Sequence, residues 1–192
     1  ASCSVACDAN NLTFKTLAKL WDVPSVYIDV PYEISEDSIM YVADELRGLA
    51  GKAEEVFGRK IDQDALRTAV AVSQRTLKLL AGSPIQRRSR LAASDMGNEM
   101  QQALAAHLAL GSPETQRMAE QMGEDFAHAP SYDGLSLVWV HTAPFFSEPL
   151  QEALNQSSTA QIVASEMLFD QVPLGDETPF RHGADEPFEA MA

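Results

Sequence analysis

The order of apolar segments in the first 33 residues constrains the fold of this chain most. Apolar residues at helical spacing between positions 12 and 21 are followed by residues 25–30, a short β-branched run typical of a buried strand. Pro24 marks the end of the helix. A helix followed by such a strand belongs to a β-α-β unit, whose first strand we expect to be missing ahead of Ala1. The predicted fold class is α/β, and the chain is expected to begin within a domain.

Long helices with one apolar side are predicted for the middle of the chain. Ser35 is the expected cap of the first, whose apolar residues recur every three or four positions up to a stop at Gly58. Asp62 is the expected cap of the second, which should end before Gly82. The sequence Ser-Pro-Glu at residues 112–114 marks another helix start.

A second β-α-β unit is predicted near the carboxyl end of the sequence. Residues 135–140 form a nearly continuous apolar run, suited to a strand covered on both faces, and residues 160–164 read as the next strand. His141 and Glu166 follow the two strands, so parallel pairing would bring both to the ligand end of the sheet. They are candidates for proton donor and acceptor, although polar residues that end buried strands are also commonly simple hydrogen-bonding partners.

Charge and composition exclude some classes of function. Fourteen basic and 28 acidic residues give a formal net charge of −14, which argues against binding a nucleic acid backbone. No apolar run is long enough to span a membrane, so we expect a soluble, cytoplasmic protein. The basic patch of Arg87, Arg88 and Arg90 is either a solvated loop or a contact for the phosphates of a ligand or for a partner subunit.

Both cysteines of the chain, Cys3 and Cys7, lie near its amino terminus. Their spacing permits one small-loop disulfide or two free thiols, and free thiols are expected in an intracellular protein.

A family resemblance lies in three parts of this region: residues 7–10 (Cys-Asp-Ala-Asn), the helix through Phe14, Leu17 and Leu20, and residues 27–33 (Tyr-Ile-Asp-Val-Pro-Tyr-Glu). These parts resemble the middle of a 2-hydroxyacyl-CoA dehydratase subunit. The family is the D-component family of 2-hydroxyglutaryl-CoA dehydratase, which is related to benzoyl-CoA reductase subunits. The resemblance continues through the long helices and the strand at residues 137–140, and so covers most of the chain.

The resemblance implies an anaerobic hydro-lyase. In that family, two homologous subunits form a heterodimer and each holds an iron-sulfur cluster, here expected to be [4Fe-4S], mainly through cysteines. An ATP-dependent activator protein injects one electron, and water is eliminated from an acyl-CoA substrate through a ketyl radical. The family also implies three parts: residues 1–33 end an amino-terminal α/β domain, residues 34–133 are helical, and residues 134–192 begin a second α/β domain. The expected architecture is therefore parts of parallel Rossmann-like β-α-β units flanking a helix-rich middle segment.

The cluster ligands expected from the family are only partly present. Cys7 occupies the family's Cys-Asp position and is the expected metal ligand. Cys3 is a candidate cofactor-binding residue, an extra thiol or a small buried residue, and Asp8 either caps the helix or touches ligand. No cysteine follows Cys7, which indicates either a truncated subunit, inactive by itself, or a divergent homologue without the cluster.

Two alternatives to a dehydratase stay open. One is a subunit of an aryl-CoA reductase of the benzoyl-CoA type. The other is a non-catalytic scaffold that binds CoA or a partner.

Overall fold

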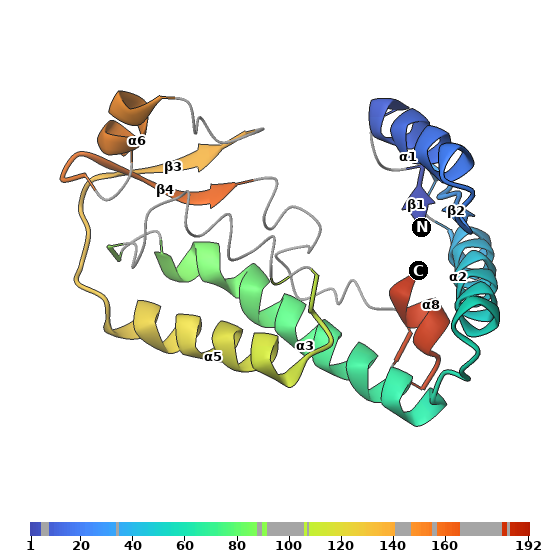
Figure 1. Ribbon diagram of the computed structural model, residues 1–192. Coiled ribbons are helices and arrows are strands. Elements are labelled where there is room, and N and C mark those ends of the chain that lie inside the picture. The colour runs from blue at the N-terminus through green and yellow to red at the C-terminus, as the bar shows by residue number, and fades with distance from the viewer. Residues whose placement is uncertain are drawn as a thin grey trace. The chain divides into compact units, whose positions relative to one another are not determined.

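The computed structural model describes residues 1–4, 8–33, 35–87, 90–91, 106, 108–140, 147–154, 157–165, 182–183 and 185–192, without the side chains of residues 82–87, 151 and 165. These residues form helices and short parallel strand pairs, which confirms the predicted α/β class (Figure 1). The chain divides into two compact units: residues 1–70 with 181–192, and residues 71–180.

The first unit contains a short parallel strand pair. Strand β1 (Ser2–Cys3) pairs with β2 (Tyr27–Ile28), and helix α1 (Asp8–Leu20) connects them and contacts β1. The prediction that the first strand would be missing was therefore wrong, because β1 occupies that place ahead of α1. A strand of two residues carries no apolar alternation that a sequence pattern could reveal.

Helix α2 (Glu36–Phe57) begins and ends where the sequence predicted. The backbone N–H of Ser38 donates to Ser35 Oγ at 3.1 Å, and Gly58 has φ 63°, the left-handed conformation that ends a helix. Helix α8 (Pro187–Met191) packs against α2, with Pro187 buried (Figure 1). Distant parts of the sequence thus build one unit.

Helix α3 (Gln63–Arg87) starts at the predicted cap but does not end at Gly82. Asp62 Oδ1 accepts hydrogen bonds from the N–H groups of Asp64 and Ala65, at 2.9 and 3.1 Å. Gly82 lies inside α3. A glycine permits the left-handed conformation that ends a helix but does not impose it. The presence of Gly82 was therefore not enough to predict where α3 ends.

The second unit combines helices with a second parallel pair. Helix α5 (Pro113–His128) begins at Ser112, whose Oγ accepts the N–H of Thr115, and buries Phe126. Strands β3 (Leu135–Trp139) and β4 (Ala160–Ser165) pair in parallel with a register shift after Leu137, and helix α6 (Glu148–Leu154), which connects them, contacts β4. Within the described residues, no helix is long and apolar enough to cross a membrane.

The face coverage predicted for β3 is not observed among the described residues. Val138 and the neighbouring Val140 are each 66% exposed, whereas Ile162 and Val163 of β4 are buried. The apolar run marked the strand correctly, but it did not indicate what would cover it.

Candidate functional site

The carboxyl ends of β1 and β2 form the first candidate edge. Ser2 is the register partner of Tyr27, and Cys3 is the partner of Ile28. Both strands therefore run toward the same edge, where the segment after β1 and residues 29–33 leave the sheet. Parallel pairing thus brings the start of the cysteine-containing segment and residues 29–33 to one edge of the sheet.

The side chain of Ser4 stabilises this edge by hydrogen bonds. Its Oγ accepts the backbone N–H of Val30 at 2.7 Å and its hydroxyl is 3.3 Å from the carbonyl oxygen of Val30, while its own N–H donates to the carbonyl of Ile28 at 3.0 Å. The strand pairing is thereby extended past Cys3 by a side chain in place of a backbone group. Sequence reasoning missed Ser4, because a serine beside a cysteine carries no signal of a partner 26 residues away.

Polar side chains that follow β2 and that belong to α2 lie beside this edge. Asp29 is exposed, and Tyr41 of α2 lies near enough to sense its charge. Burial raises the pKa of Tyr41, and the carboxylates of Glu45 and Asp29 raise it further. The phenol therefore stays protonated and can donate a hydrogen bond. Sequence reasoning did not single out Tyr41, which occupies the border of the apolar side of α2.

The predicted cofactor ligands are placed only in part. Cys3 is a partly exposed free thiol on β1, and Cys7 lies outside the described residues. Within the described ranges, no group of three or more His, Cys, Asp or Glu side chains is arranged to hold a metal ion. A cluster normally takes three or four thiolates, and the sequence supplies two. The thiols of this chain alone therefore do not fit a complete cluster site.

The carboxyl ends of β3 and β4 form a second edge of the same kind. Trp139, the last residue of β3, is the register partner of Ser165, the last residue of β4. The predicted catalytic residues His141 and Glu166 lie outside the described residues. The strand ends that precede them are side by side, as the parallel prediction required.

A buried polar network holds the start of β4. The side chain of Gln161 is fully buried and donates from Nε2 to the carbonyl oxygen of Arg90 at 2.7 Å. Arg90 in turn donates from Nη1 to the carbonyl oxygen of Ala129 at 2.9 Å and forms a backbone bridge with Ser131. Arg90, predicted as part of a solvated or ligand-binding basic patch, thus serves as an internal hydrogen-bonding residue here.

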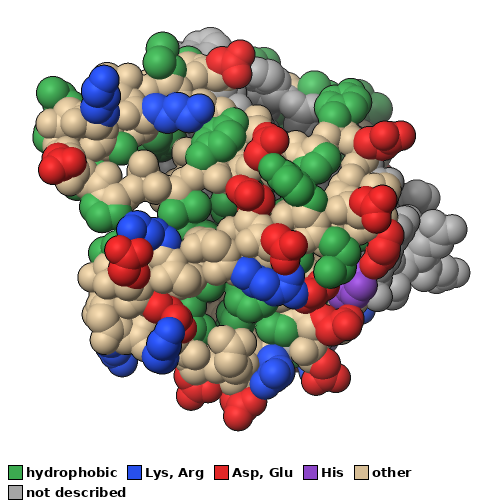
Figure 2. All heavy atoms as spheres, turned by 90° about the vertical axis from the view of Figure 1, so that its right-hand side faces the viewer, with side chains coloured by type: hydrophobic (Ala, Val, Ile, Leu, Met, Phe, Trp, Pro, Cys, Tyr) green, Lys and Arg blue, Asp and Glu red, His purple; other side chains and the backbone are tan. Residues whose placement is uncertain are grey.

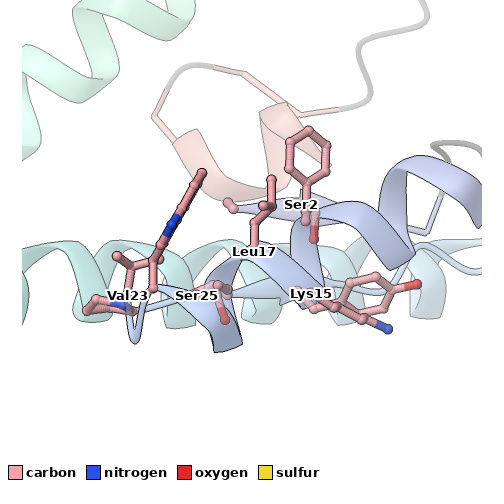
Figure 3. A pocket seen from close by; sticks show the side chains of 12 residues that line it. Ser2, Lys15, Leu17, Val23 and Ser25 are labelled. Atoms are coloured by element: carbon pink, nitrogen blue, oxygen red, sulfur yellow. The ribbon is translucent and has the colours of Figure 1, made fainter.

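A hollow of about 320 Å³ lies between α1 and the amino-terminal ends of β1 and β2. Figure 3 shows Lys15 and Leu17 reaching it from α1, and Val23 and Ser25 from the connection to β2. The ammonium of Lys15 lies 4.1 Å from the ring centroid of Tyr27, a cation–π contact. None of the lining residues comes from residues 29–33, so the hollow is separate from the carboxyl edge.

Large apolar side chains are exposed on α1 and directly after it. Trp21 is 65% exposed, and Leu12, Phe14 and Leu20 of α1 are exposed by more than half. Figure 2, in which the right-hand side of Figure 1 faces the viewer, shows hydrophobic side chains exposed among charged ones. The apolar side that predicted α1 is therefore only partly covered by the described residues.

These features define the protein as an α/β protein in which two parallel strand pairs present their carboxyl ends as candidate sites. The sequence profile of the family described as "2-hydroxyglutaryl-CoA dehydratase, D-component" matches residues 1–192. The chain belongs to this family, which confirms the resemblance seen in residues 7–33.

Two curated relatives are similar to part of the chain at less than 30% identity. The (R)-phenyllactyl-CoA dehydratase alpha subunit of Clostridium sporogenes is 28% identical over 80 residues, which are 40% of this chain and 20% of that subunit. The alpha subunit of (R)-2-hydroxyglutaryl-CoA dehydratase of Acidaminococcus fermentans is 26% identical over 80 residues, which are 40% of this chain and 17% of that subunit. The matched part thus spans a fifth or less of either relative.

Proposed function

We propose that this chain is part of a 2-hydroxyacyl-CoA dehydratase subunit, which eliminates water from a CoA thioester. The observation that carries the proposal is the match of the dehydratase family to residues 1–192. The parallel β1–β2 pair supports it, because the segment after β1 and residues 29–33 leave the same edge. The larger architecture we infer is Rossmann-like, with residues 34–133 between two α/β domains.

We assign Cys7 as one ligand of a [4Fe-4S] cluster in the intact subunit, with the remaining thiolates supplied from outside this chain. When bound, the cluster would supply one-electron chemistry, which thiolate ligation tunes. Cys3 is the second candidate, because it lies on β1 ahead of Cys7 and its thiol is free and partly exposed. Ser4 would position the intervening segment by fixing the end of β1 to Val30.

We assign His141 and Glu166 as proton donor and acceptor near the substrate. Their support is the pairing of Trp139 with Ser165, which starts both following segments at one edge of the sheet. By analogy with the family, the partners are a homologous second subunit and an ATP-dependent activator, in the cytoplasm of an anaerobic cell.

Anaerobic iron-sulfur reconstitution of the intact subunit tests the cluster assignment. Iron content and visible absorbance are compared among the wild type, Cys7→Ala and the matched variant Cys3→Ala. We expect Cys7→Ala to lose the cluster. Loss in Cys3→Ala as well would make Cys3 a second ligand, whereas retention would make it an extra thiol. If the wild type takes up no iron, the cluster assignment fails and a non-catalytic CoA-binding or partner-binding scaffold becomes the better proposal.

A substrate assay separates the dehydratase from the aryl-CoA reductase alternative. The reconstituted subunit is combined with its partner, activator and ATP, and offered a 2-hydroxyacyl-CoA or an aryl-CoA. Formation of an enoyl-CoA supports the dehydratase. Ring reduction without water elimination would replace that proposal with the reductase.

A further inference from the structure

His182 lies between carboxylates from two distant parts of the first unit. Its Nδ1 is 2.9 Å from Glu186 Oε2, next to α8, and its Nε2 is 3.0 Å from Glu36 Oε1, in the first turn of α2. The imidazole side chain is 17% exposed, whereas the carboxylate side chains are 62% and 59% exposed. The histidine is thus the central element of a bridge across 146 residues of sequence.

Only the doubly protonated imidazole can satisfy both contacts. A carboxylate accepts hydrogen bonds and does not donate them, so each ring nitrogen needs its own hydrogen to bind one. A neutral imidazole has one N–H, and its other nitrogen would turn a lone pair toward the second carboxylate. Deprotonation therefore removes one of the two contacts and leaves a repulsive pair in its place.

The other charged groups around this bridge reinforce the dependence on a positive charge. Glu189 of α8 adds a third carboxylate near His182 and is itself paired with Arg47 of α2. Arg47 also lies 5.3 Å from the ring centroid of Phe188. The Arg47 pair keeps its charges at any moderate pH, so among the described groups of this junction His182 is the one that titrates near neutrality.

We propose that His182 is a proton-dependent clasp, which fastens the segment ending in α8 to the first turn of α2 when protonated and loosens it when neutral. The clasp adjoins the first candidate edge, because Ser38 Oγ of the same α2 turn donates to the carbonyl oxygen of Glu33 at 2.6 Å. Because Glu36 and Glu186 are more than half exposed, water can replace the lost contact. Loosening is therefore graded and does not unfold the unit.

The electrostatic environment gives the direction of the response. The hydrogen bond to Glu186 raises the pKa of His182, partly offset by burial, and the bond and charge of Glu36 raise it further. A raised folded-state pKa means that the clasp is complete below about 6.5, the ordinary histidine value, and is lost as pH rises through the higher folded value.

Hydrogen exchange of the α8 amides tests this proposal without any reference to enzyme activity. The N–H groups of Ala190 and Ala192 donate to the carbonyls of Glu186 and Phe188, so they report whether α8 is formed. Exchange is measured at about pH 6 and about pH 8.5 and corrected for intrinsic rates. We expect their protection to fall roughly two- to fivefold at the higher pH, the size expected for one partly exposed ionic contact.

Matched histidine variants complete the experiment. His182→Gln should give the lower protection at both pH values. His128→Gln should behave as wild type, because His128 is exposed on α5 and its Nδ1 lies 2.8 Å from a backbone carbonyl oxygen of the same helix, that of Glu124, and not from a carboxylate. Protection of Ala190 that does not change with pH in the wild type, or that still changes in His182→Gln, would overturn the proposal.

Discussion

Replacing Gly134 with alanine should destabilise the second unit through a collision with one side chain. A Cβ at this position would lie 2.3 Å from Tyr132 Oη, 2.5 Å from Cζ and 2.9 Å from Cε1. Ordinary contacts between such atoms are about 3.5–4 Å, so the ring must move. Movement breaks the hydrogen bond that Tyr132 Oη donates to the carbonyl oxygen of Ser157 at 3.0 Å, in the turn that leads into β4.

The change in the unfolding free energy of Gly134→Ala is the sum of two destabilising effects and one stabilising effect. Overpacking costs about 1–3 kcal/mol, and the lost hydrogen bond costs about 1 kcal/mol. Alanine lowers the conformational entropy of the unfolded chain, which stabilises the folded state by about 0.4–1 kcal/mol. This gain is kept because φ of Gly134 is not positive, so alanine adopts it without strain. We expect a net loss of about 2 kcal/mol, seen as a fall in Tm of about 4–8 °C.

Urea and thermal unfolding of four variants measure this effect and locate its cause. Gly48→Ala in α2 is the matched control, because no atom lies within 4 Å of its added Cβ, and it should stabilise by about 0.5–1 kcal/mol. Gly134→Ala is also introduced into Tyr132→Ala, where the colliding ring is absent. An equal loss with and without Tyr132, or no loss at all, would refute the reasoning.

The remaining predictions concern single contacts. Ser4→Ala should lower the unfolding free energy by about 1 kcal/mol, because the N–H of Val30 loses its acceptor, while Ser4→Thr should retain it; equal stability of both variants in urea would contradict this. Ser112→Ala should cost about 1 kcal/mol through the lost cap of α5, measured by loss of helical circular dichroism on heating. Hydrogen bonds from Lys60 and a backbone N–H lower the pKa of Glu54, so its contribution is present above its unfolded pKa and lost as pH falls through the lower folded value. Acid titration of stability should be shallower in Glu54→Gln, and an unchanged titration would argue against this assignment.

Helix starts were predictable from the sequence because a cap is a local interaction. Ser35, Asp62 and Ser112 each accept an N–H two or three residues ahead, so the residues that decide the geometry stand together in the chain. Helix ends could not be predicted from residue type alone. Gly58 ends α2 in the left-handed conformation, whereas Gly82 continues α3, and the difference lies in backbone conformation rather than in residue type.

The candidate edges were predictable in direction but not in their supporting contacts. Apolar runs predicted β2, β3 and β4 but not β1, and parallel pairing places the ends of β3 and β4 together, as Trp139 and Ser165 show. The contacts of Ser4 with Val30 and of Gln161 with Arg90 join residues 26 and 71 positions apart. No periodicity encodes such a pair, because each polar residue becomes informative only after the fold brings its partner near.

Because the β1–β2 pair is small, the hydrogen bonds of the Ser4 side chain matter for the position of Cys7, the proposed cluster ligand. Two strands of two residues each bury little surface and share few backbone hydrogen bonds, so such a pair is marginal by itself. Helix α1 covers it incompletely, since Phe14 of α1 and Trp21, which follows the helix, are more than half exposed. The hydroxyl of Ser4 is therefore a large share of what fixes the end of β1 against Val30. If Cys7 holds a cofactor, its position depends on that fixed end of β1. Ser4→Ala should therefore perturb the first candidate edge more than it perturbs the helices.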